Sequence, residues 1–282
     1  MKRLWLVVGT GIVGVLVIVV AAVAAPSGPP SPTAELQANL PDLRTVVPRH
    51  LQVVNEHQRE LLRFSNGIAN TGNGPWALRP KHTLGLQPTT TAIQEIRSSG
   101  AKYQCGTQPK QVTECYTILA EHEATIFEYH PTHNHWHTGQ VALFQIRQGS
   151  PTGPVAGGQQ FKTGFCLIDL VNLDGNAPGS EKVFWDCETS FQGISAGWID
   201  QYHQATDGQQ LEVTALPDGD AYYLVSTSNP DGVFIEQRTD NNRAWQRFEL
   251  SGKGTGNRKL TMLEHSPCES PALCGAYTPN RG

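Results

Sequence analysis

Short runs of alternating apolar and polar residues recur between residues 40 and 250 of this chain. A period of two places successive side chains on opposite faces, which is typical of strands with one buried face. Residues 61–70, which read LLRFSNGIAN, alternate in this way and end at the turn sequence TGNGP. The other runs that we predict to be strands begin at 40–43 and cover 116–121, 124–129, 135–146, 164–170, 210–215, 221–228 and 244–250.

Each run is short, rich in aromatic or branched residues and bounded by Gly, Pro, Asn or Asp, as strands between turns are. The 28 glycines and 19 prolines favour many turns. We find no amphipathic helix of three turns and no internal repeat at a fixed period. The pattern therefore predicts an all-β fold, an antiparallel β-sandwich of one domain, with long loops at 149–161 and 169–183.

The amino terminus resembles an export signal. Lys2 and Arg3 precede an uncharged apolar run, Leu4 to Ala25, with a cleavage-like Ala22-Val23-Ala24. The same run is long enough to cross a bilayer, so a cleaved signal peptide and an uncleaved membrane anchor are both open. We accordingly predict a leader at 1–25, a Pro/Ser-rich linker at 26–39, a domain at 40–250 and a carboxyl-terminal tail at 251–282. The domain is expected to be secreted or extracytoplasmic.

The six cysteines fall in neighbouring pairs, which agrees with export to an oxidising compartment. Six cysteines allow fifteen pairings. We favour the local set because short loops close most readily. The predicted disulfides are Cys105 with Cys115, Cys166 with Cys187, and Cys268 with Cys274.

Composition restricts the partners. The chain is 38% hydrophobic and 16% charged, which permits a sizeable core. With 21 basic and 25 acidic residues its net charge is -4, and nucleic-acid binding would need concentrated Lys and Arg. We therefore expect no nucleic-acid partner, and contact with a membrane only through an uncleaved amino-terminal segment.

Four of the ten histidines lie between residues 130 and 137. In an extended chain His133, His135 and His137 project from one face, where three imidazoles converge. Neutral imidazoles bind Zn, Cu, Ni or Fe(II), and a three-His set leaves positions open for water or substrate. The competing interpretation is a solvated histidine patch that binds metal adventitiously.

The histidine run, together with residues downstream of it, resembles the catalytic domain of lysyl oxidase, the copper amine oxidase of extracellular matrices, over residues 40–250. In that family a W-x-W-H-x-x-H-x-H-x-H run supplies the copper ligands, and here residues 127–137 read FEYHPTHNHWH. The resemblance implies a lysyl oxidase-like β-sandwich in which His133, His135 and His137 bind copper. His130 is then a neighbour without an assigned role.

Two further motifs carry the resemblance. Residues 162–169, KTGFCLID, are similar to the family's K-A-S-F-C-L-E-D, and residues 193–202, GISAGWIDQY, to its G-L-S-P-G-C-Y-D-x-Y. The resemblance implies that Lys162 and Tyr202 become cross-linked as lysine tyrosylquinone, the organic cofactor. It also places Asp200 at the position of the catalytic base.

The activity that the resemblance implies is oxidative deamination. A primary amine, peptidyl lysine among the options, would be converted to an aldehyde by dioxygen with release of hydrogen peroxide and ammonia. Two other functions remain open on the residues alone. One is a non-catalytic exported metal-binding β-sandwich for adhesion or binding, and the other is a three-His Fe or Zn enzyme. The presence of both Lys162 and Tyr202 favours the amine oxidase.

A last match concerns calcium. Lysyl oxidases carry a calcium site joining a Pro-Asp-Leu segment to an E-x-D-x-x-N-N segment. The corresponding residues here are Asp42, the Leu43 carbonyl, Glu236, Asp240, Asn241 and Asn242. Oxygen ligands on loops suit Ca²⁺. Arg238 replaces the second acidic ligand of the family pattern, so either Asp240 substitutes for it or the arginine's charge fills the site.

Other residues depart from the family pattern. Family cysteines are missing at Trp198 and Gly208, so one disulfide near the cofactor tyrosine is absent. Ser190 and Phe144 stand where the family has histidines. We expect these differences to affect rate and substrate choice more than metal binding.

Overall fold

A computed structural model of the chain describes residues 33–82, 89–98, 117–131, 135–173, 182–187 and 191–275, with only the backbone for 157–162. The chain divides into two compact units, residues 1–32 and 33–282, and the described residues all belong to the second. The predicted leader at 1–25 and Cys105 with Cys115 lie outside the described residues. No helix in the described ranges is long and apolar enough to span a membrane.

The described elements are one short helix, α1 (Ala34–Ala38), and fifteen strands in two sheets. The six-stranded sheet has the order β1 (Leu43–Thr45), β3 (Arg59–Asn70), β11 (Trp198–Tyr202) and β9 (Val171–Asn172), with β2 (Arg49–Glu56) and β12 (Gln210–Glu212) also on β3. The nine-stranded sheet has the order β10 (Gln192–Ile194), β4 (Trp76–Pro80), β5 (Thr89–Arg97), β6 (Ile118–His130), β7 (His135–Gln148), β13 (Gly219–Ser228), β14 (Arg243–Ser251) and β15 (Lys259–His265), with β8 (Val155–Phe165) also on β7.

All described strand pairs are antiparallel, which confirms the predicted all-β antiparallel fold. The runs with the clearest alternation correspond to β3, β7, β13 and β14. The loop predicted at 149–161 was wrong in its second half, because β8 begins at Val155 and pairs with β7. Its GGQQ stretch shows no apolar alternation, but backbone hydrogen bonds to a neighbouring strand do not require one. The strand predicted at 164–170 was wrong after Phe165, where β8 ends.

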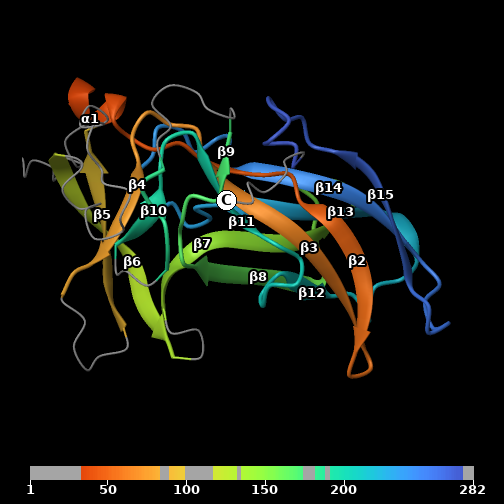
Figure 1. The fold of residues 1–282 in the computed structure, drawn as a ribbon. Coiled ribbons are helices and arrows are strands. Elements are labelled where there is room, and N and C mark those ends of the chain that lie inside the picture. The colour runs from red at the N-terminus through yellow and green to blue at the C-terminus, as the bar shows by residue number, and fades with distance from the viewer. Residues whose placement is uncertain are drawn as a thin grey trace, which may run out of the picture. The chain divides into compact units, whose positions relative to one another are not determined.

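The core forms where the two sheets face each other. In Figure 1, β3 crosses in front of β7 and β8. Phe64 of β3 and Phe144 of β7 are fully buried, and their ring centroids lie 4.8 Å apart in an edge-to-face arrangement. Leu224 of β13 and Phe248 of β14 belong to the same cluster. Phe144 therefore serves packing here, at the position where the family has a histidine.

The described sheet continues past residue 250, because β15 pairs with β14. A smaller cluster packs Ala272 and Leu273 against Ile199 of β11 and against Val46, which follows β1. Two of the predicted disulfides, Cys166–Cys187 and Cys268–Cys274, are confirmed. The second disulfide closes the loop that carries Ala272 and Leu273. The residues after 250 are thus part of the same compact unit as the sandwich.

Phe144→Ala is expected to lower the free energy of unfolding by about 3–5 kcal/mol, because it removes a ring from between the sheets and leaves a cavity. Urea denaturation monitored by circular dichroism measures the change. Met262→Ala on β15 is the control, since that side chain is 43% exposed and its loss should cost less than about 0.5 kcal/mol. Equal losses in the two variants would contradict the core assignment.

Candidate active site

The β6–β7 hairpin brings three histidine rings together. His130 pairs with His135 across the hairpin, and the rings of His130 and His137 stack with centroids 4.1 Å apart. The Nε2 atoms of His135 and His137 are 2.9 Å apart. Residues 132–134 lie outside the described residues, so the structure does not describe His133. The predicted alternation therefore places two of the three proposed ligands on one face.

The His135–His137 geometry fits two neighbouring ligands of one metal ion. Imidazole nitrogens bound at about 2.0–2.1 Å and at right angles to each other are separated by about 2.9 Å. Within the described ranges, no group of three or more His, Cys, Asp or Glu side chains is placed to hold a metal. A third protein ligand would have to come from elsewhere, and His133 is next to the pair in sequence.

A chain of direct contacts leads from this hairpin to Tyr202. Thr138, which follows His137, pairs with Phe165 at the end of β8. The ring of Phe165 stacks on that of Tyr202 with centroids 3.8 Å apart. Lys162 is on β8 opposite Leu143, three residues before Phe165, or about 10 Å along the strand. The structure describes only the backbone of Lys162.

The Tyr202 hydroxyl is enclosed by two acceptors. It lies 2.7 Å from Asp200 Oδ2 and also contacts the carbonyl oxygen of Cys166. A hydroxyl has one proton, so both contacts are satisfied together when Tyr202 donates to Cys166 and a protonated Asp200 donates to Tyr202. Burial is the main cause that raises the pKa of Asp200 well above the ordinary carboxyl value, and the nearby charge of Asp169 adds to it. Burial and Asp200 likewise raise the pKa of Tyr202, so the phenol stays neutral.

Asp169 organises the backbone around this pair. Its side chain is fully buried, and Oδ2 accepts hydrogen bonds from the backbone N–H groups of Val183 and Phe184 at 2.9 and 3.0 Å. The Ser195 hydroxyl also donates to Oδ2, and the Ser195 N–H donates to Oδ1, each at 2.7 Å. Burial raises the pKa of Asp169 to about 6, although these hydrogen bonds oppose the shift. Asp169 is the last residue of the KTGFCLID motif, and no role was predicted for it.

Gln192 links the histidine hairpin to the segment that contains Cys166. Its Nε2 donates to the Trp136 carbonyl at 2.7 Å, and its Oε1 accepts from the Leu167 N–H at 3.2 Å. The Cys166–Cys187 disulfide ties the same segment to residues 182–187. Gln192 is fully buried, and no sequence pattern singled it out, because its role depends on two partners distant in sequence.

Two of the residues proposed for calcium, Asp42 and Glu236, accept hydrogen bonds from neighbouring donors. The Asn241 amide donates to both Asp42 oxygens at 3.0 Å. Glu236 accepts from the Leu43 N–H at 2.9 Å and from the Asn242 amide at 2.7 Å. Burial raises the pKa of Glu236, and the charge of Asp42 adds to it.

The two asparagines of this cluster each keep one oxygen without a hydrogen-bond partner. Asn241 Oδ1 and Asn242 Oδ1 are buried and accept no hydrogen bond in the described part of the chain. Amide oxygens without a hydrogen-bond partner, together with two carboxylates, are oxygen ligands that suit Ca²⁺. Asp240 instead forms an exposed ion pair with Arg238 at 3.0 Å. The Leu43 carbonyl accepts from the Ser228 hydroxyl at 2.9 Å. These calcium assignments stay predictions.

Comparison with known proteins agrees with the motifs. A sequence model described as lysyl oxidase matches residues 103–257, which include the histidine run, Lys162, Asp200 and Tyr202. Lysyl oxidase homolog 1 of Bos taurus is 27% identical over 139 residues, which are 48% of this chain and 22% of that protein. Lysyl oxidase homolog 1 of Homo sapiens is 27% identical over 128 residues, 45% of this chain and 21% of that protein. The matched part of this chain thus spans about a fifth of the length of these curated relatives.

The buried carboxyl of Asp169 predicts a pH dependence of stability. Its pKa rises from the ordinary value near 3.8 to about 6 on folding, so the folded state holds this proton more tightly than the unfolded state. Its contribution is fully present below about pH 4 and is lost as the pH rises to about 6, a loss of about 3 kcal/mol. Urea denaturation between pH 4 and pH 8 measures it.

Asp169→Asn should be less stable than the natural chain at each pH, because an amide nitrogen replaces an acceptor, and it should lose this slope. Asp207→Asn is the matched control, since Asp207 is exposed, and it should retain the slope. An unchanged slope in Asp169→Asn would show that other groups cause the pH dependence.

Proposed function

Because this chain belongs to the lysyl oxidase family, we propose that it is an exported, copper- and quinone-dependent amine oxidase that converts primary amines to aldehydes. The observation that carries the proposal is the contact chain from His137 through Thr138 and Phe165 to Tyr202. This series links the hairpin that carries His135 and His137 and the strand of Lys162 to Tyr202, which supports the proposal. A binding module has no need for this arrangement.

The proposed copper ligands are His133, His135 and His137. The 2.9 Å separation of the His135 and His137 nitrogens supports the assignment, because it suits two adjacent positions on one ion. A neutral three-His set would leave positions open for dioxygen or water. Copper would supply the one-electron chemistry that oxidation of a phenol by dioxygen requires. The chain's own role is to hold both imidazoles in place through the β6–β7 pairing.

Lys162 and Tyr202 are the proposed precursors of the quinone cofactor, which would act as an electron sink for the carbon that bears the substrate's amine. Asp200 is the proposed base. Its Oδ2 lies 2.7 Å from the Tyr202 hydroxyl, in hydrogen-bond reach of the reacting position. A buried carboxyl with a raised pKa, once deprotonated, is a stronger proton acceptor than an exposed one. Asp200 would take the proton from the substrate's Cα through that oxygen.

The proposed site of action is outside the cytoplasm. The two confirmed disulfides support this, because such bonds persist in oxidising compartments. The charged and apolar order of residues 1–25 supports export, with the leader either cleaved or kept as an anchor. Primary amines, including lysine side chains of peptides, are the proposed substrates.

Mass spectrometry of a proteolytic digest tests the function. Protein matured with copper in air should yield a peptide in which Lys162 and Tyr202 are covalently joined, and the protein should release peroxide from a primary amine. Lys162→Arg, Tyr202→Phe and His137→Ala should each lose the cross-link and at least about 100-fold of the peroxide rate, because each removes a component required for the cofactor.

Lys259→Arg and Tyr223→Phe are the matched controls. Lys259 is on β15 and Tyr223 on β13, outside the strands β7, β8 and β11 that form the contact chain, so both variants should retain cross-link and turnover. A colourless protein that binds copper, lacks the cross-link and releases no peroxide would instead leave the metal-binding module as the function.

We also propose a calcium site at Asp42, Glu236, Asn241 and Asn242, with the Leu43 carbonyl and Asp240 as the less supported members. The buried, unpartnered oxygens of both asparagines carry the proposal. A cation there would join the segment before β1 to the segment before β14 and would offset the mutual repulsion of two carboxylates.

Millimolar Ca²⁺ should raise the melting temperature of the natural chain by several degrees, and a chelator should reverse the gain. Glu236→Gln should lose the response because it removes a ligand charge. Asp240→Asn should keep it, since Asp240 pairs with Arg238 in solvent. Differential scanning fluorimetry measures both. If Asp240→Asn alone lost the response, the ligand set would have to be redrawn around Asp240.

A further inference from the structure

Two tryptophans from separate segments face one lysine ammonium. The Nζ atom of Lys182 lies 4.5 Å from the ring centroid of Trp185 and 6.0 Å from that of Trp198. Both distances fall within the range in which a cation is attracted to the face of an indole. Trp185 precedes Cys187, and Trp198 begins β11. The contact therefore joins the 182–187 segment to the strand that carries Asp200 and Tyr202.

Backbone contacts anchor the two segments that carry these tryptophans. Val183 and Phe184, between Lys182 and Trp185, donate to buried Asp169, and the Cys166–Cys187 disulfide anchors the end of the segment. Trp198 is half-buried and packs against the main core cluster. The two indoles are thus held by the same contacts that hold Asp200.

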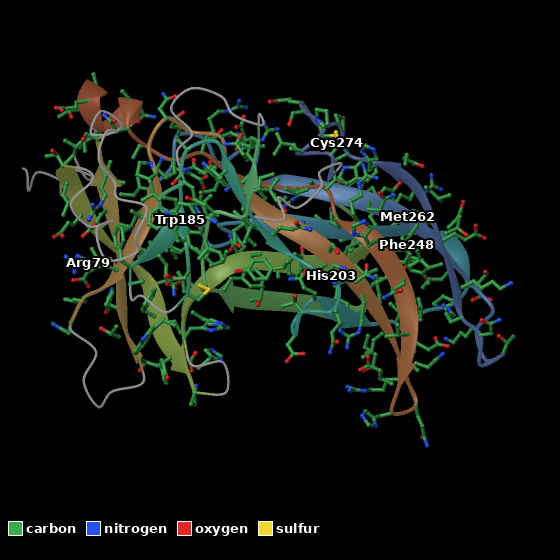
Figure 2. All side chains as sticks on the ribbon, in the orientation of Figure 1. Arg79, Trp185, His203, Phe248, Met262 and Cys274 are labelled. Atoms are coloured by element: carbon green, nitrogen blue, oxygen red, sulfur yellow. A yellow bond between two sulfur atoms is a disulfide. The ribbon has the colours of Figure 1, made fainter. Side chains whose placement is uncertain are left out.

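An incidental surface contact is the simplest competing explanation. Three observations speak against it. Trp185 (Figure 2) is a large aromatic side chain, yet it is 41% exposed. Packing of the core therefore does not explain why a tryptophan stands there. The second indole comes from a different strand. Trp198 also stands where the lysyl oxidase pattern has a cysteine, so the ring is a feature of this chain. The position of the Lys182 ammonium shows where an alkylammonium group can lie against both rings.

The indole pair has a defined relation to the proposed reaction centre. Trp198, Asp200 and Tyr202 are alternate residues of β11, which share one face of a strand. Trp198 and Tyr202 are four residue steps apart along the strand, or about 13 Å. An amine reacting at Tyr202 cannot also occupy the indole pair. A second cationic group about 13 Å from the first on the same substrate would match this separation.

We propose that Trp185 and Trp198 form a subsite for a second alkylammonium group of the substrate, which displaces Lys182 when a polycationic amine binds. In an extended peptide, lysines four residues apart are separated by about the same 13 Å. The proposal rests on the proposed amine oxidase function, since that function defines where the first amine reacts. Lysine-rich peptides and long polyamines share the required chemistry.

Binding to the full chain carrying Tyr202→Phe tests the subsite without any oxidation, so the result does not depend on whether the quinone forms. Isothermal titration calorimetry would compare a peptide with two lysines four residues apart, the same peptide with one lysine, and spermine. The two-lysine peptide should bind about three- to tenfold more tightly than the one-lysine peptide. Trp185→Ala should abolish that difference, and Lys182→Met should increase it by freeing the rings.

Trp198→Phe keeps an aromatic ring in the core and should weaken the preference only in part, because a phenyl face attracts cations less than an indole face. The indole N–H resonances of Trp185 and Trp198 should shift on titration with the two-lysine peptide.

If spermine also binds, and Trp185→Ala weakens its binding, the subsite accepts free polyamines. If spermine binding does not change in the Trp185→Ala variant, the subsite accepts only peptides. Equal affinities of the Tyr202→Phe chain for the one- and two-lysine peptides, or weaker two-lysine binding when Lys182→Met is added to it, would overturn the proposal.

Discussion

The carboxylate of Asp169 accepts four hydrogen bonds in a place that solvent does not reach, and three of the donors are backbone N–H groups. Each of those N–H groups would otherwise be buried without a partner, at a cost of about 1–3 kcal/mol. The network fixes the segment after β8, the segment before Cys187 and the turn before β11 relative to one another. The position of Asp200, and of the indole pair, depends on that constraint.

Two buried carboxyl groups close to each other set the protonation of the site. Burial raises the pKa of both Asp169 and Asp200, and the charge of Asp169 raises the pKa of Asp200 further. The phenol of Tyr202 is kept neutral by the same surroundings. Tyr202 and a protonated Asp200 satisfy each other's hydrogen bonds, and loss of the Asp200 proton leaves a strong acceptor next to the ring. The burial that raises the pKa of these two acids also makes each a stronger proton acceptor once it is deprotonated.

The sequence predicted the fold class because short runs of strand-forming residues end at turn residues, and in β14 buried positions alternate with more exposed ones. β3 is instead buried on both faces from Phe64 to Asn70, so its burial shows no period of two there. The sequence missed β8 over the GGQQ stretch, where pairing with β7 supplies the order and the side chains carry no pattern. It also ended the domain at 250, whereas the described sheet includes β15. Edge and short strands depend on a neighbour's hydrogen bonds, and the neighbour is distant in sequence.

Local spacing alone determined the convergence of His135 with His137 and the pairing of Cys166 with Cys187 and of Cys268 with Cys274, because alternation along a strand and closure of short loops are properties of neighbouring residues. The motifs that pointed to Lys162, Asp200 and Tyr202 came from resemblance and gave no contacts. Only the tertiary structure decided that Tyr202 stacks on Phe165, that Asp169 gathers three segments, that Asp240 turns to solvent and that two indoles meet at Lys182. Those contacts are set by strand register and by burial between sheets, which no short stretch of sequence contains.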